Sequence, residues 1–310
     1  MLLESSLCNA DLHPICTHLF SKPLKYCIIL ITRNAQVGGS SPPASTTSGG
    51  GVNYIALLLD YSFQSVLKNW KAVLVYGLVF VVLTLLSLIP VLSLVTNPLV
   101  QLLTIQIAVY YGTPLLKEVS KDGLYSFIEN STVGKVFTER FEVSAGIFLS
   151  SFVITLLISL TIVAVVLLSG IPFTYHSIES LEGAELTSFL LRFFALFLLI
   201  FLVISWYLYV YPIAMGYAMS KEGFGEAFLA LFKIFSPSLW KKALSFKYFV
   251  FITVAGLLEA VFLFIGVLLS FTVIFIPVGI PFLYFSNVFF GGVAARSYAM
   301  TFKDELQSRS

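Results

Sequence analysis

One acidic residue interrupts an otherwise uncharged stretch of the chain. Glu259 stands at the middle of the apolar run from Tyr248 to Ser270. An ionised carboxylate at the centre of a bilayer costs about 3 kcal/mol on insertion scales, so we expect this side chain to be neutral and to face protein. Two interpretations are open: a proton or cation relay, or a structural hydrogen bond to an amide such as Gln101, Gln106 or Asn287.

Other polar or small residues lie within apolar runs. Arg192 stands just inside the expected outer end of its run, so we expect it to reach the outer headgroups rather than the central carboxylate. The cluster of Gln101, Gln106, Tyr110 and Tyr111 predicts hydrogen bonds between helices, with a polar path as the alternative. Gly256 and Ala260 form a small-xxx-small pair that would let another helix approach closely.

Most parts of a catalytic or metal site are missing. From Val52 onward the chain has no cysteine, one histidine and three aspartates at or beyond the predicted span ends. A Ser-His-Asp triad, a cysteine metal site and a carboxylate pair therefore lack components. His176 and the glutamates every three residues after it, to Glu185, favour a solvated acidic face over a metal site. We predict a protein that is not an enzyme and has no metal or cofactor.

The elements that hold these residues are predicted to be membrane helices. Of the 310 residues, 58% are hydrophobic and only 11% are charged, and the mean hydropathy is +0.95. About 20 apolar residues of helix cross a bilayer, and helix satisfies every backbone polar group there. We predict an all-α, polytopic transmembrane helical bundle with six spans. The spans are Ala72 to Val95, Leu99 to Leu116, Ala145 to Ile171, Ser188 to Tyr211, Tyr248 to Ser270 and Val273 to Ala295.

Basic residues lie on one side of these spans. Fourteen Lys and Arg residues lie before span one, between spans two and three, between spans four and five, and after span six. The three opposite loops, Thr96 to Pro98, Pro172 to Thr187 and Phe271 to Thr272, contain none. Because Lys and Arg near span ends stay in the cytoplasm, both termini of this multi-pass cell-membrane protein are predicted to be cytoplasmic.

The spans form three predicted hairpins, each preceded by an amphipathic segment at the inner leaflet. Phe63, Val66, Leu67 and Trp70 share one helix face in the first, and Phe228, Leu231, Phe232 and Phe235 in the third. The middle segment, Val133 to Val143, has a weaker pattern. Five residues suit the headgroup boundary: Trp70, Lys71, Trp240, Lys241 and Lys242. The exits of the second and third hairpins echo each other, as Tyr217 to Glu222 and Tyr298 to Asp304.

The composition changes near residue 51. All three cysteines precede residue 28, and codons that can encode Gly38 to Pro43 form a stem and loop resembling the T-arm of a transfer RNA gene. We interpret residues 1–51 as an upstream translation outside the native protein, or as a disordered tail, with a start at Val52. An N-terminal peptide of the native protein beginning before Val52 would exclude the first interpretation. Residues 52–303 form the six-span domain and 304–310 a short cytoplasmic tail.

From Tyr54 to Lys303 the chain resembles prokaryotic six-span membrane proteins of unknown function. Their pattern is similar to that of the membrane domain attached to some glycerophosphodiester phosphodiesterases. The resemblance depends on Asn69-Trp70-Lys71, Gly225-Glu226-Ala227-Phe228, Trp240-Lys241-Lys242, Ile276-Pro277-Val278-Gly279-Ile280-Pro281 and Ala295-Arg296-Ser297-Tyr298. It implies an integral membrane module without an established activity, and it transfers no phosphodiesterase activity.

Two functions are compatible with this pattern. The first is a non-catalytic membrane module that interacts with lipids, including anionic headgroups, or with partner proteins or a second copy of itself. The alternative is a transporter of ions or small solutes that uses Glu259 as an intramembrane coupling carboxyl. The net charge of +2 and the absence of a basic block argue against nucleic-acid binding.

Overall fold

The computed structural model describes residues 51–117, 120–169, 183–270 and 276–307. The chain divides into two compact units, Met1–Asp60 and Tyr61–Ser310. The first unit is described only from Gly51, so the predicted boundary at residue 51 and the tail before it lie outside the described residues. Helix α2 (Gly51–Lys68) begins there and continues into the second unit. No strand occurs in the described ranges.

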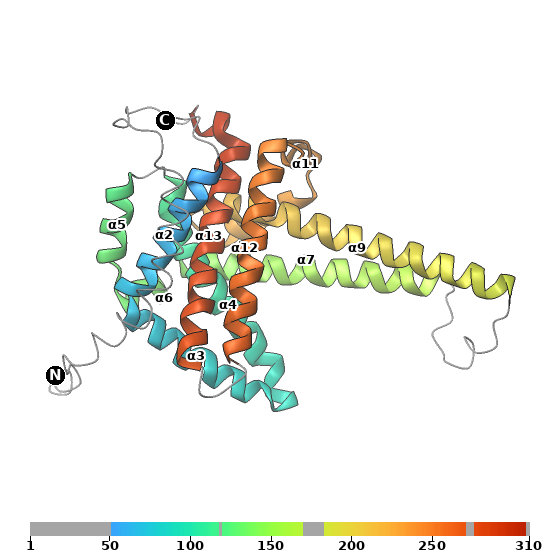
Figure 1. Cartoon of the computed structure of the whole chain (residues 1–310), viewed down its shortest axis with the longest axis horizontal. Helices are drawn as coiled ribbons and strands as arrows, with labels where there is room; N and C mark the ends of the chain where they lie inside the picture. Colours follow the sequence, from blue (N-terminus) through green and yellow to red (C-terminus); the bar gives the residue numbers. More distant parts are fainter. Residues whose placement is uncertain (1–50, 118–119, 170–182, 271–275, 308–310) are drawn as a thin grey trace. The chain divides into compact units, whose positions relative to one another are not determined.

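Six helices in the described ranges are long and apolar enough to cross a membrane, which confirms the predicted fold class. Figure 1 shows them as α3 (Trp70–Ser87), α4 (Pro90–Leu116), α7 (Phe141–Leu168), α9 (Ala184–Met219), α12 (Phe246–Ser270) and α13 (Ile276–Gln307). Shorter helices precede two of them. Before α7 these are α5 (Lys121–Glu129) and α6 (Val133–Thr138), and before α12 they are α10 (Phe224–Leu231), η1 (Phe232–Phe235) and α11 (Pro237–Ala243). Helix pairs α3–α4, α7–α9 and α12–α13 each pack together, as the three-hairpin prediction requires.

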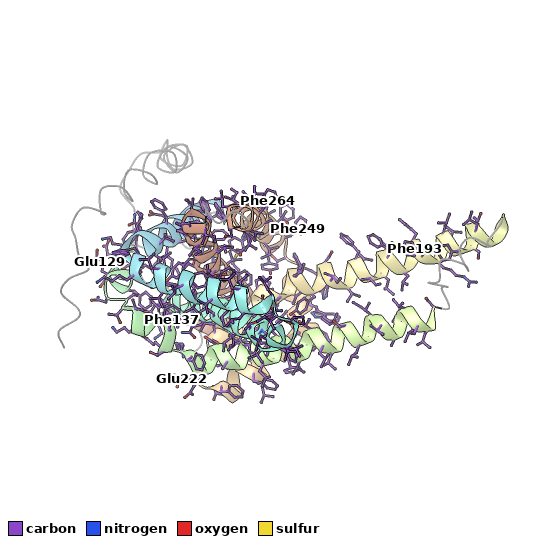
Figure 2. All side chains as sticks on the ribbon, turned by 90° about the horizontal axis from the view of Figure 1, so that it is seen from below. Glu129, Phe137, Phe193, Glu222, Phe249 and Phe264 are labelled. Carbon is purple, nitrogen blue, oxygen red and sulfur yellow. The ribbon has the colours of Figure 1, made fainter. Side chains whose placement is uncertain are left out.

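The outward faces of these helices are apolar. Phe193, Phe249 and Phe264 are each about half exposed or more, and Figure 2 shows them projecting from α9 and α12. Charged side chains such as Glu129 and Glu222 lie outside the apolar runs. This distribution is the reverse of that in a soluble protein and suits contact with lipid.

Helix α13 is the centre of the second unit. It packs against α3, α4, α9 and α12, and it is mostly buried, whereas the other five membrane helices are largely exposed. Apolar faces gain little from mutual burial in lipid, so close backbone packing must supply the attraction between helices. Small residues of α13, from Gly291 to Ala295, provide that contact.

Three glycines bring the backbones of α4, α9 and α13 together. A Cβ atom at Gly291 would meet the carbonyl oxygen of Ala108 on α4, and one at Gly216 on α9 would meet that of Ala294 on α13. A Cβ atom at Gly112 would lie 2.6 Å from the carbonyl oxygen of Gly291. A larger residue at any of these positions would push the helices apart.

The first turn between membrane helices lies earlier than predicted. We expected an outer loop at Thr96 to Pro98, but α3 ends at Ser87 and α4 begins at Pro90, with Pro98 inside the helix. Ile89 has an extended backbone, with φ −88° and ψ 115°, which is the conformation that a following proline favours. Proline at the first helical position has no N–H to leave unpaired, so Pro90 starts α4 readily.

The middle amphipathic segment differs from the prediction. Instead of one helix from Val133 to Val143, α6 ends at Thr138 and α7 begins at Phe141. Arg140, between them, has a left-handed backbone with φ 64°, which ends one helix and redirects the chain into the next. The additional helix α5 was not predicted; the side chain of Ser120 caps it by accepting a hydrogen bond from the N–H of Gly123 at 3.2 Å.

Helix α9 is longer than predicted at its C-terminal end. It extends past the expected boundary at Tyr211 to Met219, and Pro212 lies inside it. The eight further residues include Ile213, Ala214 and Met215, which are fully buried. Tertiary packing therefore keeps this segment helical although proline removes one helix hydrogen bond.

Candidate functional site

Three polar residues on α13 each contact a different neighbouring helix. Tyr284, Ser286 and Asn287 are buried, with at most 7% of each residue exposed. Successive residues of a helix are turned by about 100°, so these side chains reach different neighbours. Around α13 they form a polar belt, which we define as Tyr284, Ser286 and Asn287 with their hydrogen-bond partners.

Tyr284 connects the belt to α4 and to the start of α3. Its hydroxyl donates to the hydroxyl oxygen of Tyr111 at 2.9 Å. The amide of Asn69 donates to the same oxygen at 3.1 Å and to the carbonyl of Ile128 at 3.2 Å. Tyr61 donates to the backbone carbonyl of Tyr111 at 3.0 Å. Tyr111 therefore joins residues far apart in sequence through one hydroxyl and one carbonyl.

Asn287 connects the belt to α3. Its side-chain amide donates to the hydroxyl oxygen of Tyr76 at 3.1 Å. The ring of Tyr76 also packs edge-on against Tyr284, with centroids 5.5 Å apart. Asn287 was correctly identified as a polar residue within a span. Its expected role as the partner of Glu259 is wrong, because its amide is directed at α3 instead.

Glu259 connects the belt to α12. Ser286 donates its hydroxyl hydrogen to Oε1 of Glu259 at 2.8 Å. Oε2 of the same carboxyl is buried and has no hydrogen-bond partner. The expected amide partners were therefore wrong, and the actual partner is a serine, since α13 rather than α4 packs along this face of α12. A half-satisfied carboxyl is the least compensated group of the belt.

Gln106 serves the amphipathic segment rather than the carboxylate. Its amide donates to the carbonyls of Val136 at 2.8 Å and Glu139 at 2.9 Å, where α6 ends. It thereby satisfies carbonyl groups that a helix end leaves free. Gln101 lies five residues earlier on α4 and is exposed, so the two glutamines do not line one path.

Two further sequence predictions concern α9 and α12. Arg192 is exposed on α9 and forms no ion pair with Glu259. A Cβ atom at Gly256 would meet no atom within 4 Å, so no helix of the described residues packs closely there. The close contact between α12 and α13 occurs instead at Gly266, whose Cβ would lie 2.9 Å from the side chain of Leu283.

The predicted headgroup anchors lie on the surface of the protein. Trp70 and Lys71 are exposed, as are Trp240 and Lys241, and Lys242 is half-buried. Trp240 donates its indole N–H to the carbonyl of Ile234 at 2.6 Å and packs edge-on against Trp206 on α9. One edge of the Trp240 ring is thus fixed while the remainder is available to lipid.

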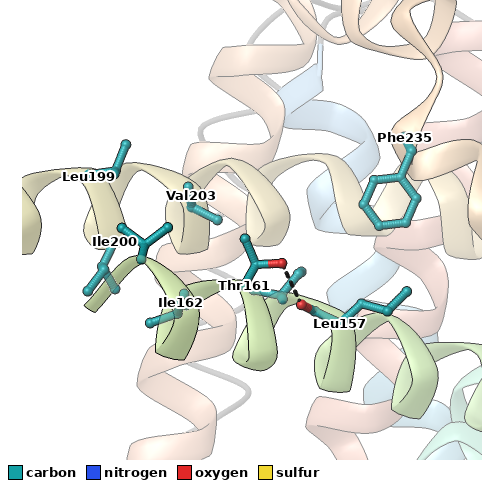
Figure 3. A pocket seen from close by; sticks show the side chains of 9 residues that line it. Leu157, Thr161, Ile162, Leu199, Ile200, Val203 and Phe235 are labelled. Atoms are coloured by element: carbon teal, nitrogen blue, oxygen red, sulfur yellow. Dashed lines mark hydrogen bonds between the residues drawn. The ribbon is translucent and has the colours of Figure 1, made fainter. Parts of the chain in front are cut away.

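A groove between α7 and α9 is almost wholly apolar (Figure 3). Its volume is about 240 Å³, and its walls include Leu157, Val203 and, from η1, Phe235. The hydroxyl of Thr161 in this groove donates to the carbonyl of Leu157 in its own helix at 2.8 Å. The groove therefore offers no free polar group to a hydrophilic solute.

No cluster of three or more His, Cys, Asp or Glu side chains suited to a metal ion occurs in the described part of the chain. His176, Glu179 and Glu182 lie outside the described residues, and Glu185 is the second residue of α9. Tyr111 was predicted from sequence to form hydrogen bonds between helices, and it does. Tyr76, Tyr284 and Ser286 were not predicted as belt members. Tyrosine and serine are common in membrane helices, and only their meeting around α13 distinguishes these three.

Comparison with known proteins gives no relative: no family model, no curated protein and no solved structure matches this chain. The resemblance to six-span membrane modules therefore stays a prediction.

Proposed function

We propose that this integral membrane protein is a non-catalytic module that interacts with the lipids of the inner leaflet through α10, η1 and α11. The observation that carries the proposal is the division of these three helices into two faces. One face is buried and consists of Ala227, Ala230, Leu231, Ile234, Leu239 and Ala243. The other exposes Phe224, Leu229, Phe235, Trp240 and Leu244.

Basic residues accompany the exposed apolar face. Lys233 and Lys241 lie within these helices, and Lys247 is the second residue of α12; all three are exposed. Apolar side chains at the boundary of the acyl chains, with lysines at headgroup level, are the pattern of a helix that lies in the membrane interface. Each lysine near an anionic leaflet contributes about 1 kcal/mol of attraction.

The proposal is tested with the purified full chain in nanodiscs of phosphatidylcholine alone or mixed with phosphatidylglycerol. We expect thermal stability to rise with the anionic lipid, because a ligand that binds only the folded state stabilises it. The same rise should shrink as salt concentration increases. Equal stability in both lipid compositions would remove the support for the proposal.

A second candidate function is transport of an ion or small solute, and the unpartnered Oε2 of Glu259 favours it. An intramembrane ionisable residue without full compensation is a functional candidate by default. A flux across reconstituted vesicles that Glu259→Gln abolishes would support transport. A flux that persists unchanged in Glu259→Gln would exclude this carboxyl as the coupling group.

A further inference from the structure

Aromatic rings gather where α9 and α13 end together. The ring of Tyr217 on α9 packs against Tyr298 and Phe302 on α13, each with centroids 5.8 Å apart. The rings of Tyr298 and Phe302 are 5.2 Å apart. These residues come from the two hairpin exits that echo each other in sequence, so the repeated segments meet in the folded chain.

Three lysines converge on these rings. Nζ of Lys233 lies 4.0 Å from the ring centroid of Tyr217, and Nζ of Lys221 lies 4.6 Å from the same centroid. Nζ of Lys242 lies 4.0 Å from the ring centroid of Phe302. They come from the end of α9, from η1 and from α11, so only the folded chain brings them together.

A fourth cation fixes the segment that carries Lys221. Arg140, held in its left-handed conformation, donates from Nη1 to the carbonyl of Lys221 at 2.9 Å. Its Nη2 donates to the carbonyl of Met219 at 3.5 Å. Because the carbonyl of Met219 belongs to the last turn of α9 and Lys221 follows the C-cap, a guanidinium there also complements the negative end of the helix dipole.

The carboxylates of the described residues do not pair with Lys221 or Lys233. Among the described residues, the ion pair that forms is Lys68 with Glu129, and neither Lys221 nor Lys233 has a carboxylate within ion-pair distance. Glu222 is next to Lys221 in sequence but is exposed and lies at the periphery (Figure 2). The two ammonium groups that face the ring of Tyr217 repel each other, and an anion bound between them would be attracted to both.

We propose that Lys221, Lys233 and Lys242, arranged around Tyr217 and Phe302, form a binding site for the phosphate of an anionic phospholipid headgroup. This site rests on the proposed function and adds to it a specific location. Lysine donates to phosphate from a flexible stem, so the ammonium groups can turn from the rings toward a phosphate. The exposed apolar residues of η1 and α11 flank the site and would hold the acyl chains of the same lipid.

The test compares two double variants of the full chain in detergent micelles. Lys221→Gln with Lys233→Gln removes two charges of the site. Lys117→Gln with Lys135→Gln removes two exposed charges outside α10, η1 and α11 and serves as the matched control. Each protein is titrated with phosphatidylglycerol or phosphatidylcholine, and the apparent affinity is derived from the rise in unfolding temperature.

We expect the site variant to bind phosphatidylglycerol roughly thirtyfold more weakly than the wild type. The control should stay close to the wild type, because its charges lie outside the helices of the proposed lipid-binding surface. Titration with phosphatidylcholine should give the same result for all three proteins. Equal losses in both variants would overturn the site while leaving a diffuse lipid interaction in place. No effect of phosphatidylglycerol on the wild type would overturn the proposed function as well.

Two further measurements test the ligand and the variants. Inorganic phosphate should not change the unfolding temperature in a phosphatidylcholine background. If phosphate stabilised the wild type but not the site variant, the ligand would be a soluble phosphate, and the proposal that it is a lipid would be overturned. If the double site variant does not fold, Lys233→Gln alone is used, since this side chain is exposed. Lys221→Arg with Lys233→Arg keeps the charges and should restore binding; failure of this rescue would overturn the site.

Discussion

Ser286 on α13 donates a hydrogen bond to Glu259 on α12 at 2.8 Å, and the second oxygen of that carboxyl has no partner. This pair joins the central helix of the second unit to its neighbour through a single side-chain hydrogen bond. The free energy of this hydrogen bond decides between two roles for Glu259. Either the carboxyl mainly holds α12 in place, or it is a group that folding does not need.

A double-mutant cycle measures that energy. Ser286→Ala and Glu259→Leu, singly and together, should give a coupling free energy of about 0.6 kcal/mol, and no more than about 1.7 kcal/mol, as for other hydrogen bonds between membrane helices. The measurement is reversible unfolding in mixed micelles. A coupling near zero would show that the hydrogen bond contributes nothing, and Glu259 would then need a functional explanation.

Replacement of Gly291 by alanine should destabilise the protein by about 1–3 kcal/mol, because the new Cβ would meet the carbonyl oxygen of Ala108 on α4. Gly256→Ala is the matched control: it is also in a membrane helix, and its Cβ would meet no atom within 4 Å. Alanine should be neutral there or stabilise the helix by up to about 1 kcal/mol. Similar losses of stability for the two variants would contradict close packing at Gly291.

Tyr111→Phe should cost more stability than Tyr61→Phe. The first change removes the hydroxyl oxygen that accepts hydrogen bonds from both Tyr284 and Asn69. These two buried donors then lack this acceptor. The second removes one donor to a backbone carbonyl. An unsatisfied buried donor costs about 1–3 kcal/mol, whereas a typical hydrogen bond contributes about 1 kcal/mol. Chemical denaturation of the two variants in the same detergent gives the comparison, and the reverse order would exclude Tyr111 as the centre of the network.

The position of the first turn can be checked by labelling with a membrane-impermeant maleimide. The chain has no cysteine after residue 27, so replacement of Cys8, Cys16 and Cys27 by serine gives a clean background. Cysteine at Leu88 should react in intact cells, because the turn between α3 and α4 lies there and is expected to face outward. Cysteine at Asn97 lies inside α4 and should react slowly. Faster labelling at position 97 than at position 88 would support the loop expected at Thr96 to Pro98 instead.

The fold class could be predicted from sequence because it depends on local composition. Twenty apolar residues in a row specify a membrane helix whatever they contact, and the six such runs match the six helices of the described residues that are long and apolar enough to cross a membrane. The boundaries were less accurate, since they depend on single residues. Pro90, rather than Pro98, starts α4, and buried contacts extend α9 beyond Pro212.

Composition and hydropathy are enough to predict that this chain forms membrane helices, that Glu259 is the charge in the middle of a span, and that basic residues gather on one side of the spans. Which groups meet depends on the tertiary structure. Glu259 is paired with Ser286 rather than with an amide, and Lys221 and Lys233 share the ring of Tyr217. The physical reason is that hydropathy places a residue along the membrane normal, whereas its partners depend on how each helix is rotated. That rotation is set by close contacts such as Gly291 against Ala108.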